Sequence, residues 1–104
     1  MAQFDVHRNL DPASRHQVPY LLDIQADLLS GLATRVVVPL LTAASIAHPL
    51  QILNPAFSVE GTRVILSTPE LAGIARSELG ETVATLAAER DTIIATLDLL
   101  LTGA

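Results

Sequence analysis

The chain has 104 residues, of which 50% are hydrophobic and 16% charged, a composition that fits a single domain (residues 1–104) with one hydrophobic core. Eleven acidic residues against six arginines give a net charge of −5, which argues against binding the phosphate backbone of nucleic acids as the main activity. The absence of cysteine excludes disulfides and thiolate metal sites, and it fits a reducing cytoplasm.

We expect a cytoplasmic protein without a targeting segment. The first ten residues lack the apolar stretch of a signal peptide. Residues 36–59 carry no charged side chain, but Pro39, Pro49 and Pro55 interrupt them, which argues against a membrane-spanning helix. We interpret this stretch as a buried strand, a loop and a second strand; a contact between two subunits is the alternative.

The first strands are indicated by alternating or β-branched residues. In Gln3–Arg8 every second residue is apolar, so we expect a half-buried strand with His7 on its polar face. Tyr20–Gln25 and Arg35–Leu40 are predicted as the two central strands, the second because it contains three consecutive valines.

A polar corner separates these two strands. Ala26-Asp27 ends the first of them, and Ser30-Gly31 has the chemistry of a turn. Between them lie two adjacent leucines, Leu28 and Leu29. A core does not require a leucine pair at a corner, so this pair either packs inward or faces a partner.

The second half begins with more strands. Glu60-Gly61 is predicted to be the two-residue turn of a hairpin with the arms Phe57–Val59 and Thr62–Ser67. Further short strands are expected at Gln51–Leu53 and Leu71–Ala75.

A C-terminal helix is predicted from Glu81 onward, with Gly103 as the residue that follows its end. Arg90 interrupts the apolar stripe, so a break near Ala87–Ala88 is the alternative, with a short turn before a longer terminal helix. Apolar residues recur every three or four positions, at Val83, Leu86, Ala87, Ile93 or Ile94, Leu97, Leu100 and Leu101.

No pattern of residues indicates an enzyme, a metal site or a cofactor. Asp23 and Asp27 could be paired catalytic carboxylates, but capping of a turn is the favoured interpretation. The three histidines lack metal-ligand spacing, no serine lies in a glycine-flanked elbow, and the five glycines form no phosphate loop.

An ordered set of residues along nearly the whole chain resembles the CcdB family, the toxins of toxin–antitoxin modules that poison DNA gyrase. The resemblance implies an SH3-like barrel that is mainly β, with an antiparallel main sheet, a small secondary sheet and a C-terminal helix, in a homodimer. The matching residues are Phe4, Val6, Asp23-Ile24-Gln25, Asp27-Leu28-Leu29, Arg35 with Val36 to Leu40, Leu53-Asn54-Pro55, Ser67-Thr68, Gly80-Glu81, Val83-Ala84 and Leu86, with Glu89-Arg90-Asp91 in the same neighbourhood.

The resemblance also implies a surface that binds the gyrase A subunit. In the family the helix ends in an aromatic residue followed by Trp-Gly-Ile, and the tryptophan stacks on an arginine of gyrase. This chain has Thr102 where the family has the tryptophan. The residues implied for gyrase binding are Leu28, Leu29, Asp98, Leu101, Thr102, Gly103 and Ala104.

The second implied partner is a cognate antitoxin, which neutralises the toxin, overlaps the gyrase site and makes the DNA contacts when the complex represses its operon. Two alternatives remain: a divergent member that binds an antitoxin or another target without poisoning gyrase, and a ribonuclease toxin of the same fold. The ribonuclease would use His16, Arg63 or Arg15, and Asp23. The antitoxin-binding residues implied here are His7, Ala26, Leu28, Asp98 and Thr102.

Overall fold

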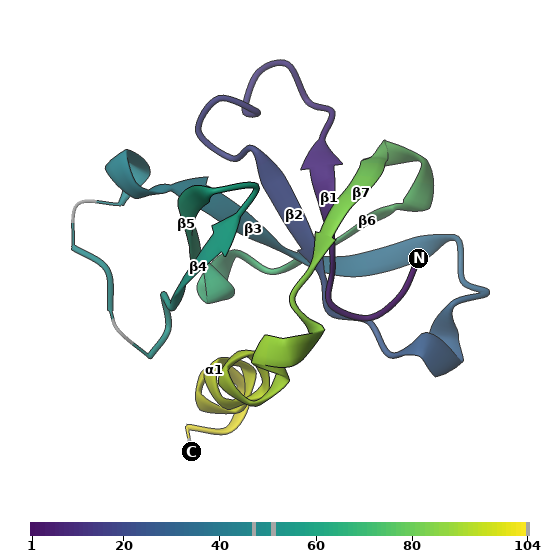
Figure 1. Cartoon of the computed structure of the whole chain (residues 1–104). Helices are drawn as coiled ribbons and strands as arrows, with labels where there is room; N and C mark the ends of the chain where they lie inside the picture. The colour runs from purple at the N-terminus through teal and green to yellow at the C-terminus, as the bar shows by residue number, and fades with distance from the viewer. Residues whose placement is uncertain (47, 51, 104) are drawn as a thin grey trace.

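A computed structural model describes residues 1–46, 48–50 and 52–103. In this part of the chain seven strands precede one α-helix, and five single 3-10 turns lie between them (Figure 1). The strands are β1 Asp5–Asn9, β2 Tyr20–Asp23, β3 Thr34–Thr42, β4 Ala56–Val59, β5 Thr62–Leu66, β6 Ala72–Ala75 and β7 Leu79–Thr85. The helices are η1 Asp27–Leu29, η2 Ala43–Ser45, η3 Thr68–Glu70, η4 Arg76–Glu78, η5 Ala87–Glu89 and α1 Arg90–Thr102.

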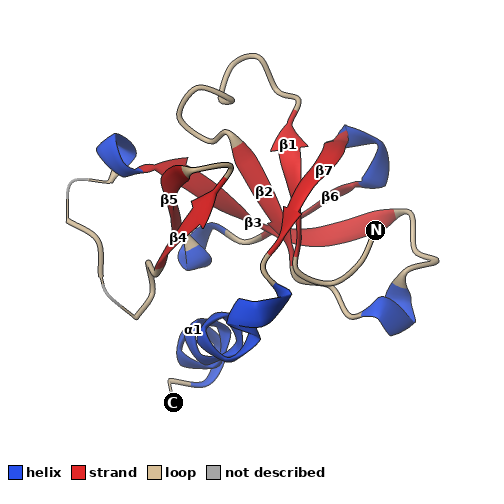
Figure 2. Ribbon diagram, in the orientation of Figure 1, coloured by secondary structure: helices blue, strands red, loops and turns tan. Residues whose placement is uncertain are grey.

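All the strands described belong to one curled antiparallel sheet in the order β4-β5-β3-β2-β1-β7, with β6 paired to β3 beside β5 (Figure 2). The mainly β fold with a C-terminal helix is therefore confirmed. The small secondary sheet that the family resemblance implied corresponds to the β4–β5 arm. This arm remains hydrogen-bonded to β3 through Leu40–Thr42. No helix in the described ranges is long and apolar enough to cross a membrane.

One face of the sheet forms the core. Val6, Leu22 and Val38 are neighbours across β1, β2 and β3, and all three are fully buried. Because side chains alternate between faces along a strand, this face continues to Leu40 and, across the next pairing, to Leu66. The helix closes the core from one end through Ile93, which is also fully buried (Figure 1).

The predicted hairpin is confirmed. Glu60 and Gly61 have φ values of 52° and 77°, the two positive angles that a type I′ turn requires. The predicted strand at 71–75 is also present as β6.

The strand expected at Gln51–Leu53 is wrong where the structure describes it; Gln51 itself lies outside the described residues. Ile52, Leu53 and Asn54 form a turn. Asn54 closes it from both sides, because its Oδ1 accepts from the Leu50 N–H (3.0 Å) and its own N–H donates to the Leu50 carbonyl (2.6 Å). Local bonding of this kind by asparagine competes with strand pairing.

The helix begins later than Glu81. Residues from Leu79 to Thr85 form β7, which pairs with β1 and contains the β-branched residues Thr82 and Val83. The α-helix starts at Arg90, after η5, close to the break expected as the alternative. The Arg90 guanidinium lies 6.0 Å from the centroid of the Phe4 ring, a cation–π contact that explains an arginine in the apolar stripe.

Candidate binding surface

The corner between β2 and β3 presents its leucines to solvent. Leu28 is 94% exposed and Leu29 is 47% exposed, and both belong to η1. Leu32, three residues further on, is also exposed. Of the two interpretations of the leucine pair, the structure therefore favours the one in which it faces outward.

Gln25 ties the two ends of this corner together. Its side-chain Nε2 donates to the carbonyls of Leu29 (3.1 Å) and Thr34 (3.2 Å), and its Oε1 accepts from the Val36 N–H (3.0 Å). A single buried amide thus satisfies backbone groups on both sides of η1. The corner is a braced loop, because its start and its return to β3 are bonded to the same side chain.

A buried ion pair lies beneath Gln25. Arg35 donates from Nε (2.8 Å) and Nη2 (2.7 Å) to Oδ2 of Asp23, and both side chains are fully buried. Asp23 Oδ1 accepts from the Gln25 N–H at 3.0 Å. Asp23 does cap the turn, as expected, but its pairing with Arg35 was not predicted.

Asp27 is bonded separately from Asp23. Its Oδ1 accepts from the backbone N–H of Gln3 at 2.7 Å and thereby fixes the N-terminal segment to the corner. Asp23 and Asp27 therefore have different backbone partners, and the side chain of Asp23 is directed into the interior.

The C-terminal end of α1 is the second apolar surface. Leu101 is 72% exposed, and Leu99 and Leu100 are half-buried, so the last turn is apolar on several sides. Thr102 donates its hydroxyl to the carbonyl of Asp98 (2.7 Å), which turns its polar group back onto the helix. Gly103 has a φ of 77° and donates its N–H to the Leu99 carbonyl (3.0 Å), as predicted for the residue after the helix.

His7 departs from the expected polar, exposed face of its strand. Its side chain is 1% exposed. Nδ1 lies 3.1 Å from the Gly80 carbonyl, and because a carbonyl only accepts, this bond requires the proton on Nδ1. The register of β1 and β7 shifts on both sides of His7, and such an irregularity re-aims side chains so that strict alternation fails.

The expected site residues thus form separate groups. Ala26, Leu28 and Leu29 share the corner, whereas Asp98, Leu101, Thr102 and Gly103 share the helix end; Ala104 lies outside the described residues. Figure 1 shows η1 and the C-terminal end of α1 at different places on the molecule. His7 joins neither group because it is buried.

The ribonuclease set is not assembled at the surface. Asp23 is fully buried against Arg35, whereas His16, Arg15 and Arg63 are exposed. Among the described residues, no group of three or more His, Cys, Asp or Glu is placed to hold a metal ion.

Arg8 is neutralised by two carboxylates. Its Nε donates to Glu81 (2.7 Å) and its Nη2 to Glu60 (3.0 Å), and the Tyr20 hydroxyl also donates to Glu60 (2.5 Å). The hydrogen bond to Glu81 raises the pKa of Arg8 above its ordinary value. The hydrogen bond from Tyr20, followed by the charge of Arg8, lowers the pKa of Glu60. Burial, then the bond to Glu60, raises the pKa of Tyr20.

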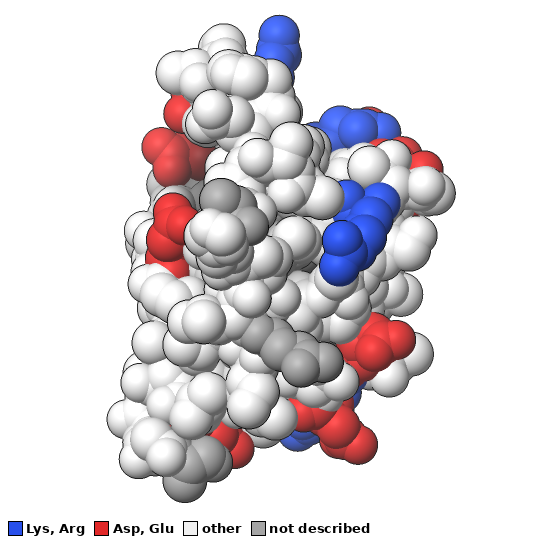
Figure 3. Space-filling view, turned by 90° about the vertical axis from the view of Figure 1, so that its left-hand side faces the viewer, with Lys and Arg blue, Asp and Glu red and all other residues white. Residues whose placement is uncertain are grey.

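The face that carries the β4–β5 arm and the loop before it is mostly uncharged, with acidic and basic groups toward its margins (Figure 3). Leu50 and Ile52 are exposed in that loop. This agrees with the absence of charged residues from 36 to 59.

Sequence reasoning missed the support of the corner. Gln25 and Arg35 were recognised only as matching residues, although an arginine that opens a run of valines is a signal for a buried ion pair. Its partner Asp23 comes from the neighbouring strand, so the pair could be found only once the pairing of β2 with β3 was fixed.

A curled sheet, a closing helix and two exposed apolar surfaces define a small β domain with the features of a protein-binding module. The chain belongs to the CcdB family: the family model described as CcdB protein matches residues 3–103. No curated protein matches the chain.

Among solved structures, the chain is similar to an endoribonuclease in complex with its cognate antitoxin from Mycobacterial species. The TM-score is 0.77 at 16% sequence identity, over 97% of this chain and 94% of the other. At this identity the likeness establishes the shared fold.

Proposed function

We propose that this protein is the toxin of a type II toxin–antitoxin module, which binds the DNA gyrase A subunit and traps the cleaved-DNA complex. The observation that carries the proposal is the corner of a CcdB-family domain with Leu28 almost fully exposed and supported from inside by Gln25, Asp23 and Arg35. A braced, exposed leucine can enter a pocket of a partner with little loss of conformational entropy on binding.

The proposed gyrase surface combines the corner with the end of α1. Burying a leucine contributes about 1.5–3 kcal/mol, so Leu28 and Leu101 together would contribute about 3–6 kcal/mol toward the cost of association. The Thr102 hydroxyl is occupied by the Asp98 carbonyl, which leaves Leu101 as the main exposed apolar group of the last turn. Loss of an interface tryptophan commonly costs ~2 kcal/mol or more, which corresponds to roughly thirtyfold in affinity, so Thr102 requires a compensating change in the target.

The second proposed partner is a cognate antitoxin that covers Ala26, Leu28, Asp98 and Thr102 and represses the operon together with the toxin. The antitoxin in the similar solved complex supports this proposal. A segment that folds on binding can cover two separate patches, as the corner and the helix end require. We also propose a homodimer, since exposed leucines are numerous for a chain of this size.

The test is a DNA-cleavage assay with gyrase from the source organism and ATP, comparing the native chain with Thr102→Trp. Trapping of cleaved DNA by the native chain would establish a gyrase poison that does not need the tryptophan. Trapping by Thr102→Trp alone would show an intact scaffold whose target has changed. Failure of both, with folded dimers, would refute gyrase as the target and leave a divergent antitoxin-binding member.

A ribonuclease toxin is the second candidate, since a protein of this fold is named an endoribonuclease. The candidate predicts cleavage of RNA that persists through purification and is lost in His16→Ala. Because Asp23 is buried, a ribonuclease would have to act without the carboxylate of Asp23.

A further inference from the structure

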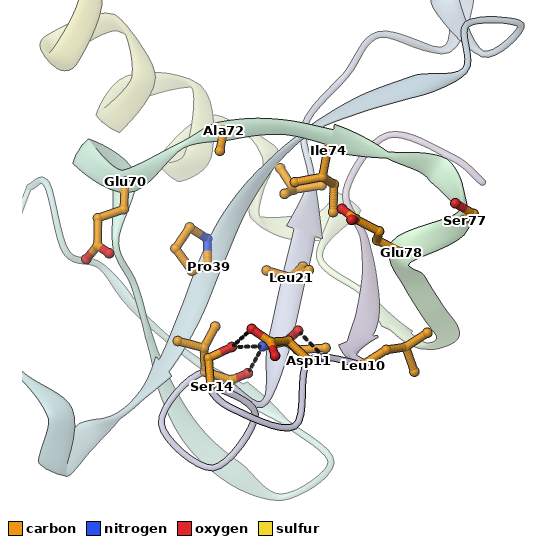
Figure 4. Close-up of a pocket in the computed structure, with 13 residues that line it drawn as sticks. Leu10, Asp11, Ser14, Leu21, Pro39, Glu70, Ala72, Ile74, Ser77 and Glu78 are labelled. Atoms are coloured by element: carbon orange, nitrogen blue, oxygen red, sulfur yellow. Dashed lines mark hydrogen bonds between the residues drawn. The ribbon is translucent and has the colours of Figure 1, made fainter.

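A groove of about 630 Å³ lies on the face of the sheet opposite the core (Figure 4). Leu21 and Pro39 are paired across β2 and β3, and Val37 is paired with Ala72 of β6. These residues alternate with the core residues Leu22 and Val38, so their side chains form the floor on the other face. No residue of η1 or of α1 lines the groove, which separates it from the binding surface described above.

The rim of this groove is acidic. Asp11, Glu70 and Glu78 line it, and the lining residues include no arginine, lysine or histidine. The ion pairs among the described residues use other carboxylates, those of Asp23, Glu60 and Glu81.

Two of the three rim carboxylates, those of Asp11 and Glu70, already accept hydrogen bonds from nearby groups, but none of these groups is a cation. Asp11 accepts from the Ala13 N–H (3.0 Å) and the Ser14 hydroxyl (3.1 Å), and Glu70 accepts from the Ser67 hydroxyl (2.6 Å). The charges of the rim therefore remain available to a positively charged ligand.

The positions of the rim carboxylates favour an extended ligand. Glu70 and Glu78 lie beyond opposite ends of β6, and the apolar side chains of Ala72 and Ile74 lie between them (Figure 4). An extended peptide directs every second side chain to the same side, so it can place an aliphatic residue on the floor and cations at both ends.

We propose that this groove binds an extended basic segment of a partner protein, with Arg or Lys side chains at Glu70 and Glu78 and an aliphatic side chain on Leu21 and Ile74. The inference does not depend on gyrase being the target. The groove is an interaction surface separate from the corner and the helix end, and its negative charge complements a basic peptide.

The probe is a labelled, blocked peptide containing Arg-Ser-Leu-Ser-Arg, whose two arginines and leucine are directed to the same side in an extended chain, and the matched control has glutamate in place of arginine. We expect anisotropy to detect binding of the arginine peptide only, with NMR shifts concentrated at Ala72, Gly73 and Ile74. Glu70→Gln and Glu78→Gln should each weaken binding about twofold to fivefold at low salt. Glu89→Gln, an exposed carboxylate outside the groove, is the control variant.

Equal binding of both peptides, shifts outside β6, or unchanged affinity in the Glu70→Gln/Glu78→Gln double variant would overturn the proposal. Sedimentation of the same variants addresses the alternative occupant. If the double variant converts a dimer into monomers, the groove is an interface between copies of this chain and the peptide proposal is wrong. Both carboxylates are exposed, so thermal unfolding should confirm that the variants fold.

Discussion

Leu28 is the residue whose exposure is hardest to explain by folding alone. With 94% of its surface exposed, it contributes almost nothing to the core. An apolar side chain kept in solvent at a braced corner is typical of an interaction site.

We expect Leu28→Asp to keep the fold and to weaken binding of the antitoxin or of gyrase at least tenfold, because the leucine no longer enters an apolar pocket and a charge must be desolvated. Isothermal titration with the antitoxin segment or a gyrase A fragment measures the change. Leu50→Asp, at an exposed leucine outside the corner, serves as the control. Equal losses in the two variants would contradict a specific role for Leu28.

Breaking the buried pair of Asp23 and Arg35 is expected to lower the stability of the fold, whereas Leu28→Asp is expected to leave the fold intact. Arg35→Met leaves the Asp23 carboxylate buried without its cation, so the free energy of unfolding should fall by about 3–5 kcal/mol. The double variant Asp23→Leu/Arg35→Met removes both charges and should recover most of that loss. Urea unfolding measures both. If the double variant were as unstable as the single one, the ion pair would not be the cause.

At the level of elements, the hairpin of β4 and β5 is held to the sheet by polar contacts at its tip. Glu60 in the turn is bonded to Tyr20 of β2 and Arg8 of β1, and Arg8 also reaches Glu81 of β7. The turn of the hairpin is thus linked to β1, β2 and β7 through two carboxylates, one hydroxyl and one guanidinium.

This network predicts that the stability of the fold depends on pH in the acidic range. The pKa of Glu60 is lower in the folded state than its ordinary value of 4.5, so its stabilising contribution is complete above that pH. The contribution is lost as the pH falls through the lowered pKa. We expect the melting temperatures of the native chain and Glu60→Gln to differ at pH 7 and to converge as the pH falls below 4.5 and through the lowered pKa of Glu60. Glu89→Gln should show no such convergence, and a constant difference for Glu60→Gln down to pH 2 would contradict the assignment.

At the scale of the whole molecule, the net charge of −5 predicts how DNA is bound. We expect the chain alone to show no salt-dependent binding to operator DNA, since such binding relies on clustered positive charge and the chain has six arginines against eleven acidic residues. Gel shifts over a series of salt concentrations, with and without the antitoxin, measure this. A shift produced by the chain alone would contradict the assignment of DNA contacts to the antitoxin.

Local patterns allowed much of the fold to be predicted. The central strands, the hairpin at Glu60-Gly61 and the terminal helix all follow from alternation, turn chemistry and helical spacing. The start of the helix was placed too early, because Val83 and Leu86 fit a helical stripe as well as they fit β7 and the turn after it. Only the pairing of β7 with β1 decides between the two.

The candidate site was predictable only in part. The adjacent leucines Leu28 and Leu29 stand out in the sequence, but their direction stayed open between packing inward and facing a partner, and the structure exposes them. The bonds of Gln25 depend on the pairing of β2 with β3, and the burial of His7 depends on the pairing of β1 with β7, with a separation of 73 residues between His7 and Gly80. No local pattern contains that information.

Under the proposed function, and because the corner is braced from inside, a survival selection against toxicity would yield two kinds of escape variant. Changes at Leu28 would leave normal amounts of folded protein that no longer harms the cell. Changes at Asp23, Gln25 or Arg35 would abolish toxicity from positions that no partner touches, by releasing the corner or lowering the amount of folded protein. Only when the abundance of each variant is measured in the same cells can such a map separate the residues that make contact from those that hold them in place.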